Sequence, residues 1–281
     1  MLDEAVTNFF LNHPIFKTET PELFLISSFF LCLGRLFPIM MMAPFFGSKL
    51  VPAPIKVGFS LALSLIFFPK VFVDTSTYLQ FDMYFIGLLI KELFVGFLLG
   101  YLASLPFHIA QSSGTIVDHQ RGAQNLQAQD PSLQAQSSPV GLLYNYLLIT
   151  VFFSIKGPFL FLDVVLDSYE LLPIDQFFKP SFYQYNSIFF QECLGIIHHV
   201  VQLAAQLAAP ALLTVLMTDL FLGVSNRLAP QVQVIFLGMP LKALLGLGVL
   251  FPAWEFIIKQ LSKESISFIL DIKRYMQLLS M

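Results

Sequence analysis

The chain has 281 residues, of which 56% are hydrophobic and only 12% are charged, and its formal net charge at pH 7 is -3. This balance lies outside the range of soluble globular proteins and predicts an integral membrane protein. The small net charge also argues against the basic stripe that nucleic-acid binding needs, so we expect no nucleic-acid partner.

Apolar runs approach the roughly 20 residues that a helix needs to cross the hydrocarbon core of a bilayer. They cover residues 23–46, 57–73, 83–110, 140–162, 188–222 and 232–258. Charged residues interrupt several of them, among them Arg35, Lys91, Glu92, Asp219 and Lys242. A charge at mid-bilayer costs about 2.5–3.5 kcal/mol. We therefore expect broken helices that pack on protein rather than on lipid.

One face of the helix expected over 83–110 carries Glu92, Gly96 and Gly100, which recur at every fourth position. The glycines permit close approach of another helix, with the carboxylate ready for a buried partner. Lys91 directly precedes Glu92, and because sequence neighbours do not face each other on a helix, both charges are expected to pair with other helices. Internal packing and subunit assembly are equal alternatives for this face.

Residues 111–139 form a polar stretch between apolar runs. They contain seven glutamines but only three charged residues, Asp118, Arg121 and Asp130. A lipid-facing segment could not satisfy so many amides, and a solvated linker is normally richer in charge. We therefore expect a polar loop that lies inside protein or lines a polar passage.

The second half of the chain begins with a mixed, proline-containing segment, 163–187, which is expected to connect two halves. Further on, Asp219, Arg227, Pro230 and Lys242 predict a broken helical hairpin whose polar bend suits an interface better than lipid. After residue 258, apolar residues at helical spacing alternate with charges. This pattern predicts an amphipathic helix at the membrane surface or against a partner.

The chain lacks the patterns of common enzyme classes: there is no H-E-x-x-H, no G-x-S-x-G and no Walker-type glycine loop. Asp163 and Asp219 lack the context of an intramembrane aspartyl protease. His198 and His199 point about 100° apart on a helix and cannot easily clasp one metal ion. We expect no catalytic residue, no cofactor and no metal site, and we expect Cys32 and Cys193 to be buried thiols.

Several motifs follow one another in a specific order. Gly114-x-x-x-Asp118-x-Gln120-Arg121-Gly122 leads to Asp130-Pro131 and then to Ser137-Ser138-Pro139-x-Gly141. Elsewhere stand Arg35 with Pro38 and Pro44, Glu92 with Gly96 and Gly100, Ser168-Tyr169 leading to Pro173, and Arg227-x-x-Pro230 with Gly238, Pro240 and Lys242. Together they resemble the SctT (YscT) family of type III secretion export-apparatus proteins, which is related to flagellar FliR. The D-x-Q-R-G form is more similar to the injectisome branch.

The resemblance implies an all-α fold, a membrane-associated bundle of broken helices and helical hairpins. It implies an SctR-like portion over 1–187 and an SctS-like helical hairpin with the amphipathic tail over 188–281. The implied function is a non-enzymatic, multi-pass subunit of an export gate in the bacterial inner membrane. Implied partners are SctR-like and SctS-like subunits, SctU-like and SctV-like components, membrane lipid and secreted polypeptides in transit.

The resemblance also suggests that a loop within 111–139 plugs the closed pore. Candidate plug residues are Gly114, Asp118, Gln120, Arg121, Gly122, Asp130 and Pro131. Candidate assembly residues are Arg35, Glu92, Gly96, Gly100, Asp219, Arg227, Pro230 and Lys242. The alternative is a secondary transporter that binds its substrate at broken helices around Arg227 and Asp219, and it would function as an isolated protein.

Overall fold

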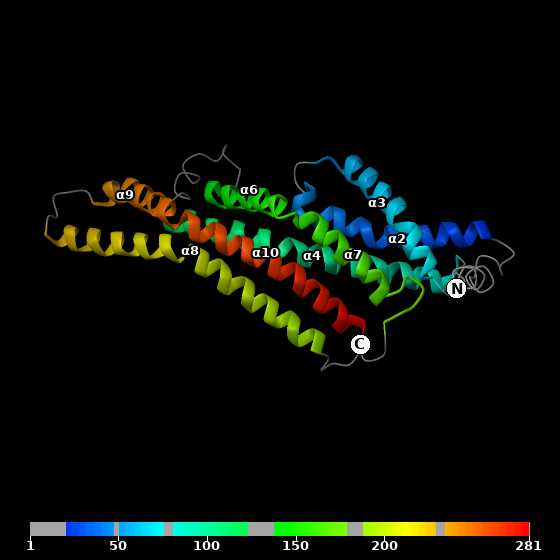
Figure 1. The fold of residues 1–281 in the computed structure, drawn as a ribbon. Coiled ribbons are helices and arrows are strands. Elements are labelled where there is room, and N and C mark those ends of the chain that lie inside the picture. Colours follow the sequence, from blue (N-terminus) through cyan, green and yellow to red (C-terminus); the bar gives the residue numbers. More distant parts are fainter. Residues whose placement is uncertain are drawn as a thin grey trace. The chain divides into compact units, whose positions relative to one another are not determined.

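The computed structural model describes residues 21–47, 51–75, 81–122, 138–178, 188–228 and 234–280. In these residues the regular elements are helices (Figure 1), which confirms the predicted all-α class. They are α2 (Pro21–Met42), the 3-10 helix η2 (Pro44–Phe46), α3 (Ala53–Val73), α4 (Met83–Gln120), α6 (Pro139–Ser154), α7 (Gly157–Leu171), α8 (Ile188–Leu228), α9 (Val234–Gly248) and α10 (Leu250–Ser280).

Among the described residues, four helices are long and apolar enough to cross a membrane: Glu22–Met42, Ala53–Val73, Met83–Gln120 and Leu194–Leu228. Two pairs of consecutive helices that meet at a bend, α6 with α7 and α9 with α10, raise the number to six if each pair is one broken span. The chain is therefore a multi-pass helical membrane protein.

The chain forms two compact units, each assembled from separated segments. The first comprises Met1–Ser104, Pro158–Glu192 and Phe268–Met281, and the second comprises Leu105–Gly157 and Cys193–Ser267. Helices α4, α8 and α10, and α7 through its first residue, contribute to both units. The predicted boundary at residue 187 separates an SctR-like from an SctS-like portion by family resemblance, whereas the two compact units are defined by contacts. That boundary therefore stays a prediction.

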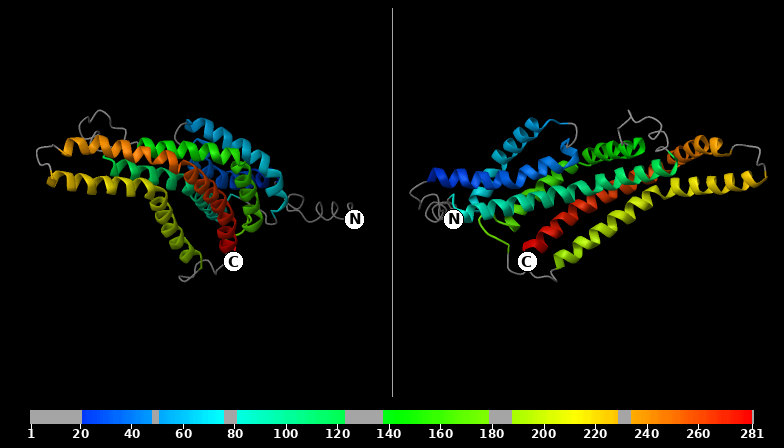
Figure 2. Two further views of the ribbon diagram at one scale, coloured as in Figure 1. Left: turned by 60° about the vertical axis from the view of Figure 1, so that its left-hand side comes forward. Right: turned by 180° about the vertical axis from the view of Figure 1, so that it is seen from behind.

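In the first unit, α2 and α3 pack against each other (Figures 1 and 2). The buried face of α3 combines Leu63, Phe67 and Val71 with Ser60 and Ser64. Both hydroxyls donate to the carbonyl four residues earlier in the helix, at 2.8 Å. The serines can therefore lie in an apolar interior because their hydrogen bonds are made locally.

In the second unit, α8 lies alongside α9 and α10 (Figure 2). Asp219 pairs with Lys242, and His199 lies 3.4 Å from Glu264. The residue nearer the end of α8, Asp219, contacts the start of the α9–α10 segment, and His199, nearer the start of α8, contacts a residue further along that segment. The two arms are therefore antiparallel. The predicted helical hairpin is confirmed over these residues, although Pro230 lies outside the described part.

The residues of the predicted amphipathic tail are helical and form the C-terminal part of α10. Its buried face includes Ile269, Ile272 and Met276, and it packs within the first unit. On the outer side, Lys273 donates to Asp167 at 2.7 Å. The sequence predicts that the apolar face of this helix lies on the membrane surface or on a partner. In the structure it packs on the protein's own chain.

Two of the expected loops are wrong in part. Residues 111–120 continue α4, because the Ser113 and Thr115 hydroxyls donate to carbonyls of the preceding turn at 2.8 Å and no proline intervenes. Residues 163–171 belong to α7 rather than to a connector, and their charges occupy the outer face of an amphipathic helix. Polar composition indicated loops where helices satisfy their own polar groups.

The run expected over 140–162 is divided by a break between α6 and α7. Lys156 takes a left-handed conformation with φ 59°, which ends the helix. Gly157 follows directly against the Phe152 ring, where a Cβ atom would lie 2.5 Å from Cε2. Only glycine fits this approach, so the break is built into the sequence.

Candidate functional site

The first candidate site is a buried charge cluster within the first unit, centred on Arg35 of α2 and Glu92 of α4. Arg35 Nε donates to Glu92 Oε2 at 2.5 Å, and Nη2 donates to Oε1 at 2.9 Å. Both side chains are fully buried. Glu92, which lies on the glycine face of α4, is thus paired with a buried arginine. The pair is bidentate, a geometry that the planar guanidinium of arginine permits.

The remaining Arg35 donors are directed to α7 and the residue after it. Nη1 donates to Ser168 Oγ at 3.0 Å, and Nη2 donates to the Leu172 carbonyl at 2.7 Å. The guanidinium carbon also lies 4.1 Å from the centroid of the Tyr169 ring. Arg35 therefore joins α2, α4 and α7 at one point.

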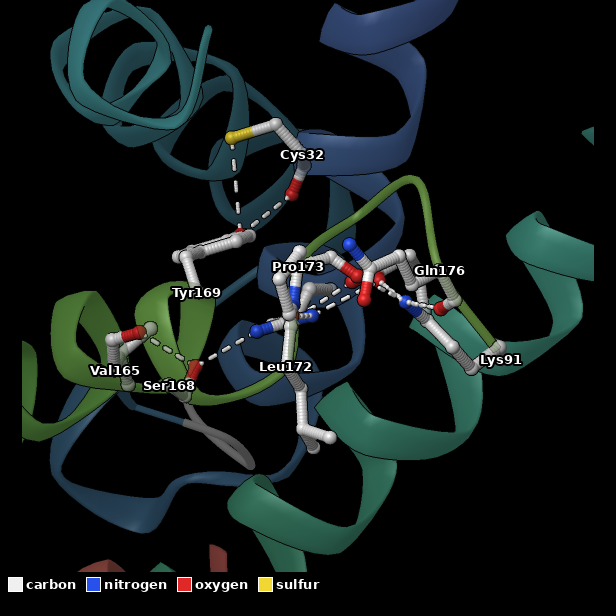
Figure 3. Close-up of polar contacts among 10 residues, drawn as sticks. Cys32, Lys91, Val165, Ser168, Tyr169, Leu172, Pro173 and Gln176 are labelled. Carbon is white, nitrogen blue, oxygen red and sulfur yellow. Dashed lines mark hydrogen bonds and ion pairs between the residues drawn. The ribbon is translucent and has the colours of Figure 1, made fainter. Parts of the chain in front are cut away.

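Lys91 enters the cluster from α4 and points to the segment after α7 (Figure 3). Its Nζ donates to the carbonyls of Pro173 at 2.6 Å and Gln176 at 2.8 Å. It also lies 2.7 Å from Glu92 Oε1. The expectation that the charges of Lys91 and Glu92 pair with other helices rather than with each other holds only in part: Glu92 pairs with Arg35 of α2, but Lys91 Nζ also reaches the Glu92 carboxylate.

Ser168 and Tyr169, which the sequence shows only as part of a motif, lie in the cluster (Figure 3). The Ser168 hydroxyl accepts from Arg35 and donates to the Val165 carbonyl at 2.6 Å. The Tyr169 hydroxyl donates to the Cys32 carbonyl at 3.0 Å. Cys32 is buried as expected, whereas the Cys193 side chain lies outside the described part of the chain.

Gly96 and Gly100 set the distance between α2 and α4. A Cβ atom on Gly96 would lie 3.0 Å from Arg35 Cα and closer still to the Arg35 carbonyl, and one on Gly100 would lie 3.1 Å from Ile39 Cα. This close approach brings Glu92 within reach of the Arg35 guanidinium. Within this chain the glycine face thus serves internal packing, and an additional role in subunit assembly stays a prediction.

The second candidate site lies in the second unit, where Asp118 joins the end of α4 to the start of α6. Asp118 Oδ1 accepts from Arg121 Nε at 2.7 Å. Its other oxygen, Oδ2, accepts from the Ser138 hydroxyl and from the Val140 backbone N–H, the latter at 3.0 Å. Ser138 is the N-cap of α6, and its hydroxyl accepts from the Gly141 N–H at 2.8 Å.

Two glycines allow this junction. A Cβ atom on Gly114 would lie 2.5 Å from Gly141 Cα, so the backbones of α4 and α6 meet there. Gly122 follows α4 with φ 85°, and its N–H donates to the His119 carbonyl at 3.1 Å. The side chain of Gln120 is exposed, while Asp130 and Pro131 lie outside the described residues.

Of the remaining predicted residues, Asp219, Arg227 and Lys242 lie on the hairpin, and Pro230 lies outside the described residues. Asp219 and Lys242 form an ion pair that is partly exposed, and Arg227 lies exposed in the last turn of α8. Among the residues that the structure describes, no group of three or more His, Cys, Asp and Glu side chains is placed to hold a metal ion. The two clusters are therefore polar junctions between helices.

Fully buried charges among helices long enough to cross a membrane are typical of a multi-pass membrane protein whose spans pack on protein. The chain belongs to the bacterial export proteins, family 1, whose sequence profile matches residues 26–266. This confirms the resemblance to the SctT (YscT) family.

Relatives from secretion and flagellar systems are similar over most of the chain. Yop proteins translocation protein T of Yersinia pestis is 36% identical over 67% of this chain and 70% of its own length. Surface presentation of antigens protein SpaR of Shigella sonnei is 31% identical over 77% and 81%. Flagellar biosynthetic protein FliR of Bacillus subtilis is 29% identical over 78% and 82%.

Proposed function

We propose that this chain is a non-enzymatic subunit of a type III secretion export gate in the bacterial inner membrane, and that it helps to form and close a protein-conducting pore. Its partners in this proposal are SctR-like and SctS-like subunits, with SctU-like and SctV-like components nearby. Residues 111–139 supply the element that closes the pore. The names of the relatives, which refer to translocation and flagellar biosynthesis, support the assignment to export.

The Asp118 junction is the observation that carries the pore-closing part. It fixes the residues on both sides of 123–137, since Asp118 and Arg121 precede this segment and Ser138 and Val140 follow it. A polar segment rich in glutamine thus starts and returns at one point of a membrane protein. Amides and small side chains can hold a passage shut and release it cheaply, because few ion pairs must break.

The exposed faces of the helices support an assembled state. In the second half of α8, the exposed large apolar residues are Leu213, Leu216, Met217, Leu220, Phe221, Val224 and Leu228. Exposed apolar patches of this kind mark surfaces that partners or lipid cover. Gly96, Gly100, Asp219, Arg227, Pro230 and Lys242 stay candidates for contacts with other subunits.

The transporter alternative receives no comparable support. It needs Asp219 available near Arg227 for a substrate, whereas the Asp219 carboxylate pairs with Lys242. It also predicts transport by the isolated chain, whereas an export gate requires the complex. Purification with and without the SctR-like and SctS-like subunits separates the two functions.

Deleting residues 123–136 tests the pore-closing role, because the deletion leaves Asp118, Arg121 and Ser138 in place. We expect cells that express the complex to become permeable to ions and small solutes, while the yield of the complex stays normal. A variant in which glycine and serine replace the same residues at equal length is the matched control for chain connectivity. Unchanged permeability of the deletion variant with a normal yield of the complex would contradict the proposal.

A further inference from the structure

We infer that Asp118 is the residue that positions the start of α6 against the end of α4, acting through Ser138 and the first turn of α6. The inference rests on the proposed function only where it concerns permeability, since the junction itself is a matter of geometry. Asp118 is 3% exposed, so its partners come from the protein rather than from solvent. Its carboxylate joins the end of α4 to the start of α6, two helices whose backbones also meet at Gly114 and Gly141.

The chemistry of the junction requires a carboxylate. The first N–H groups of a helix have no partner within the helix and carry partial positive charge. At α6, the Val140 N–H donates to Asp118 and the Gly141 N–H donates to Ser138. The Ser138 hydroxyl donates a hydrogen bond to Asp118, so one carboxylate accepts from both the N-cap side chain and the first turn of α6. A neutral side chain at 118 cannot accept all of these bonds.

A third element reaches the same junction within the second unit. A Cβ atom on Gly246 of α9 would lie 3.4 Å from Val215 Cγ2 and 3.7 Å from Arg121 Cβ. The stem of Arg121 therefore lies against the α8–α9 hairpin on one side while its guanidinium binds Asp118 on the other, with Arg121 Nη2 2.5 Å from Oδ1. Arg121 therefore lies between Asp118 of α4 and α9.

The spacing can be measured with spin labels on both helices in the assembled complex. Gln120 on α4 and Leu143 on α6 are both exposed and lie outside the junction. They are replaced by cysteine for labelling in a chain whose native Cys32 and Cys193 are replaced by alanine. The distribution of distances between the two spin labels, measured by pulsed electron paramagnetic resonance, then reports how tightly α4 and α6 are held together.

Asp118→Asn and Ser138→Ala are expected to turn one narrow distance distribution into a broad one. Losing an N-cap bond costs typically about 1 kcal/mol. For Ser138→Ala, the population of molecules in which α4 and α6 have moved apart is therefore expected to rise about fivefold. Ser138→Thr keeps the hydroxyl and is expected to restore the narrow distribution. Asp163→Asn makes the same chemical change at an exposed carboxylate of α7 and is the matched control.

A narrow distribution in both Asp118→Asn and Ser138→Ala would overturn the inference. Permeability of cells with the same variants keeps this result distinct from the proposed function. If the junction variants separate the helices while the 123–136 deletion leaves permeability unchanged, the positioning role stands and the pore-closing role fails. If the deletion leaks while the junction variants stay narrow, the positioning role fails alone.

Discussion

Glu92 of α4 holds Arg35 of α2 through two hydrogen bonds, of 2.5 and 2.9 Å, with both side chains fully buried. Lys91 joins the same carboxylate, and Asp175 is a second buried carboxylate in the segment after α7. Backbone carbonyls of Leu172, Pro173 and Gln176 accept further hydrogen bonds from Arg35 and Lys91. The end of α7 and the segment after it are therefore fastened to α2 and α4 by electrostatics as much as by apolar packing.

Arg35→Ala is expected to destabilise the protein by about 3–5 kcal/mol, because it leaves Glu92 as a buried and uncompensated charge. The free energy of unfolding, measured by denaturant titration of the purified chain in detergent, tests this. Lys259→Ala is the matched control, since it breaks an ion pair of similar length, 2.6 Å, whose side chains are 75% and 80% exposed. Similar losses in both variants would refute the role of burial.

Exchanging the two charges as Arg35→Glu with Glu92→Arg is not expected to rescue stability. A carboxylate at 35 would face the Leu172 carbonyl, and an arginine at 92 would lie beside Lys91. The same titration tests the double variant. Recovery to the parent free energy would mean that only the pair matters and that the carbonyls around it do not.

Lys91→Met is expected to loosen residues 172–178, because it leaves the Pro173 and Gln176 carbonyls without their donor in a buried site. Amide hydrogen exchange in this segment should accelerate relative to the parent protein. Lys70→Met serves as the control, since Lys70 pairs with Glu170 at a half-exposed position. Equal exchange in the parent and in Lys91→Met would show that the segment is held by other contacts.

The sequence was informative where structure depends on short-range spacing. The recurrence of Glu92, Gly96 and Gly100 predicts a close-packed helical face because three residues determine it locally. Which helix meets that face is a different matter. Arg35 lies 57 positions away, and no periodicity along α4 contains its identity. The spacing therefore predicts that Glu92 has a buried partner, but it does not predict that this partner is Arg35 of α2.

Polar composition was the weaker guide, as residues 111–120 demonstrate. Ser113 and Thr115 form their hydrogen bonds within α4, so a polar segment extends a membrane-length helix instead of leaving it. The junction of Asp118 with Ser138 could not be predicted either, since it joins positions 20 residues apart across the end of one helix and the start of another. Tertiary contacts decide such cases.

Gly96→Ala is expected to destabilise the first unit by about 1–3 kcal/mol, because the added methyl group meets the Arg35 backbone and forces α2 and α4 apart. Gly58→Ala makes the same change in α3, where nothing lies within 4 Å of the added atom. That control is expected to gain up to about 1 kcal/mol from helix propensity alone. Opposite signs in the two free energies of unfolding would confirm the close approach, and a gain in both would contradict it.

Gly246 offers the most direct probe of contact between the hairpin and the Asp118 junction. Gly246→Ala is expected to leave the Gln120–Leu143 label distance unchanged, because its Cβ atom would make ordinary contacts of 3.4 and 3.7 Å with Val215 and Arg121. Gly246→Phe extends past that space and is expected to push Arg121 away from Asp118, broadening the distance distribution as Asp118→Asn does. A narrow distribution in Gly246→Phe would mean that the hairpin yields instead of the junction, and that α9 exerts no control over the spacing of α4 and α6.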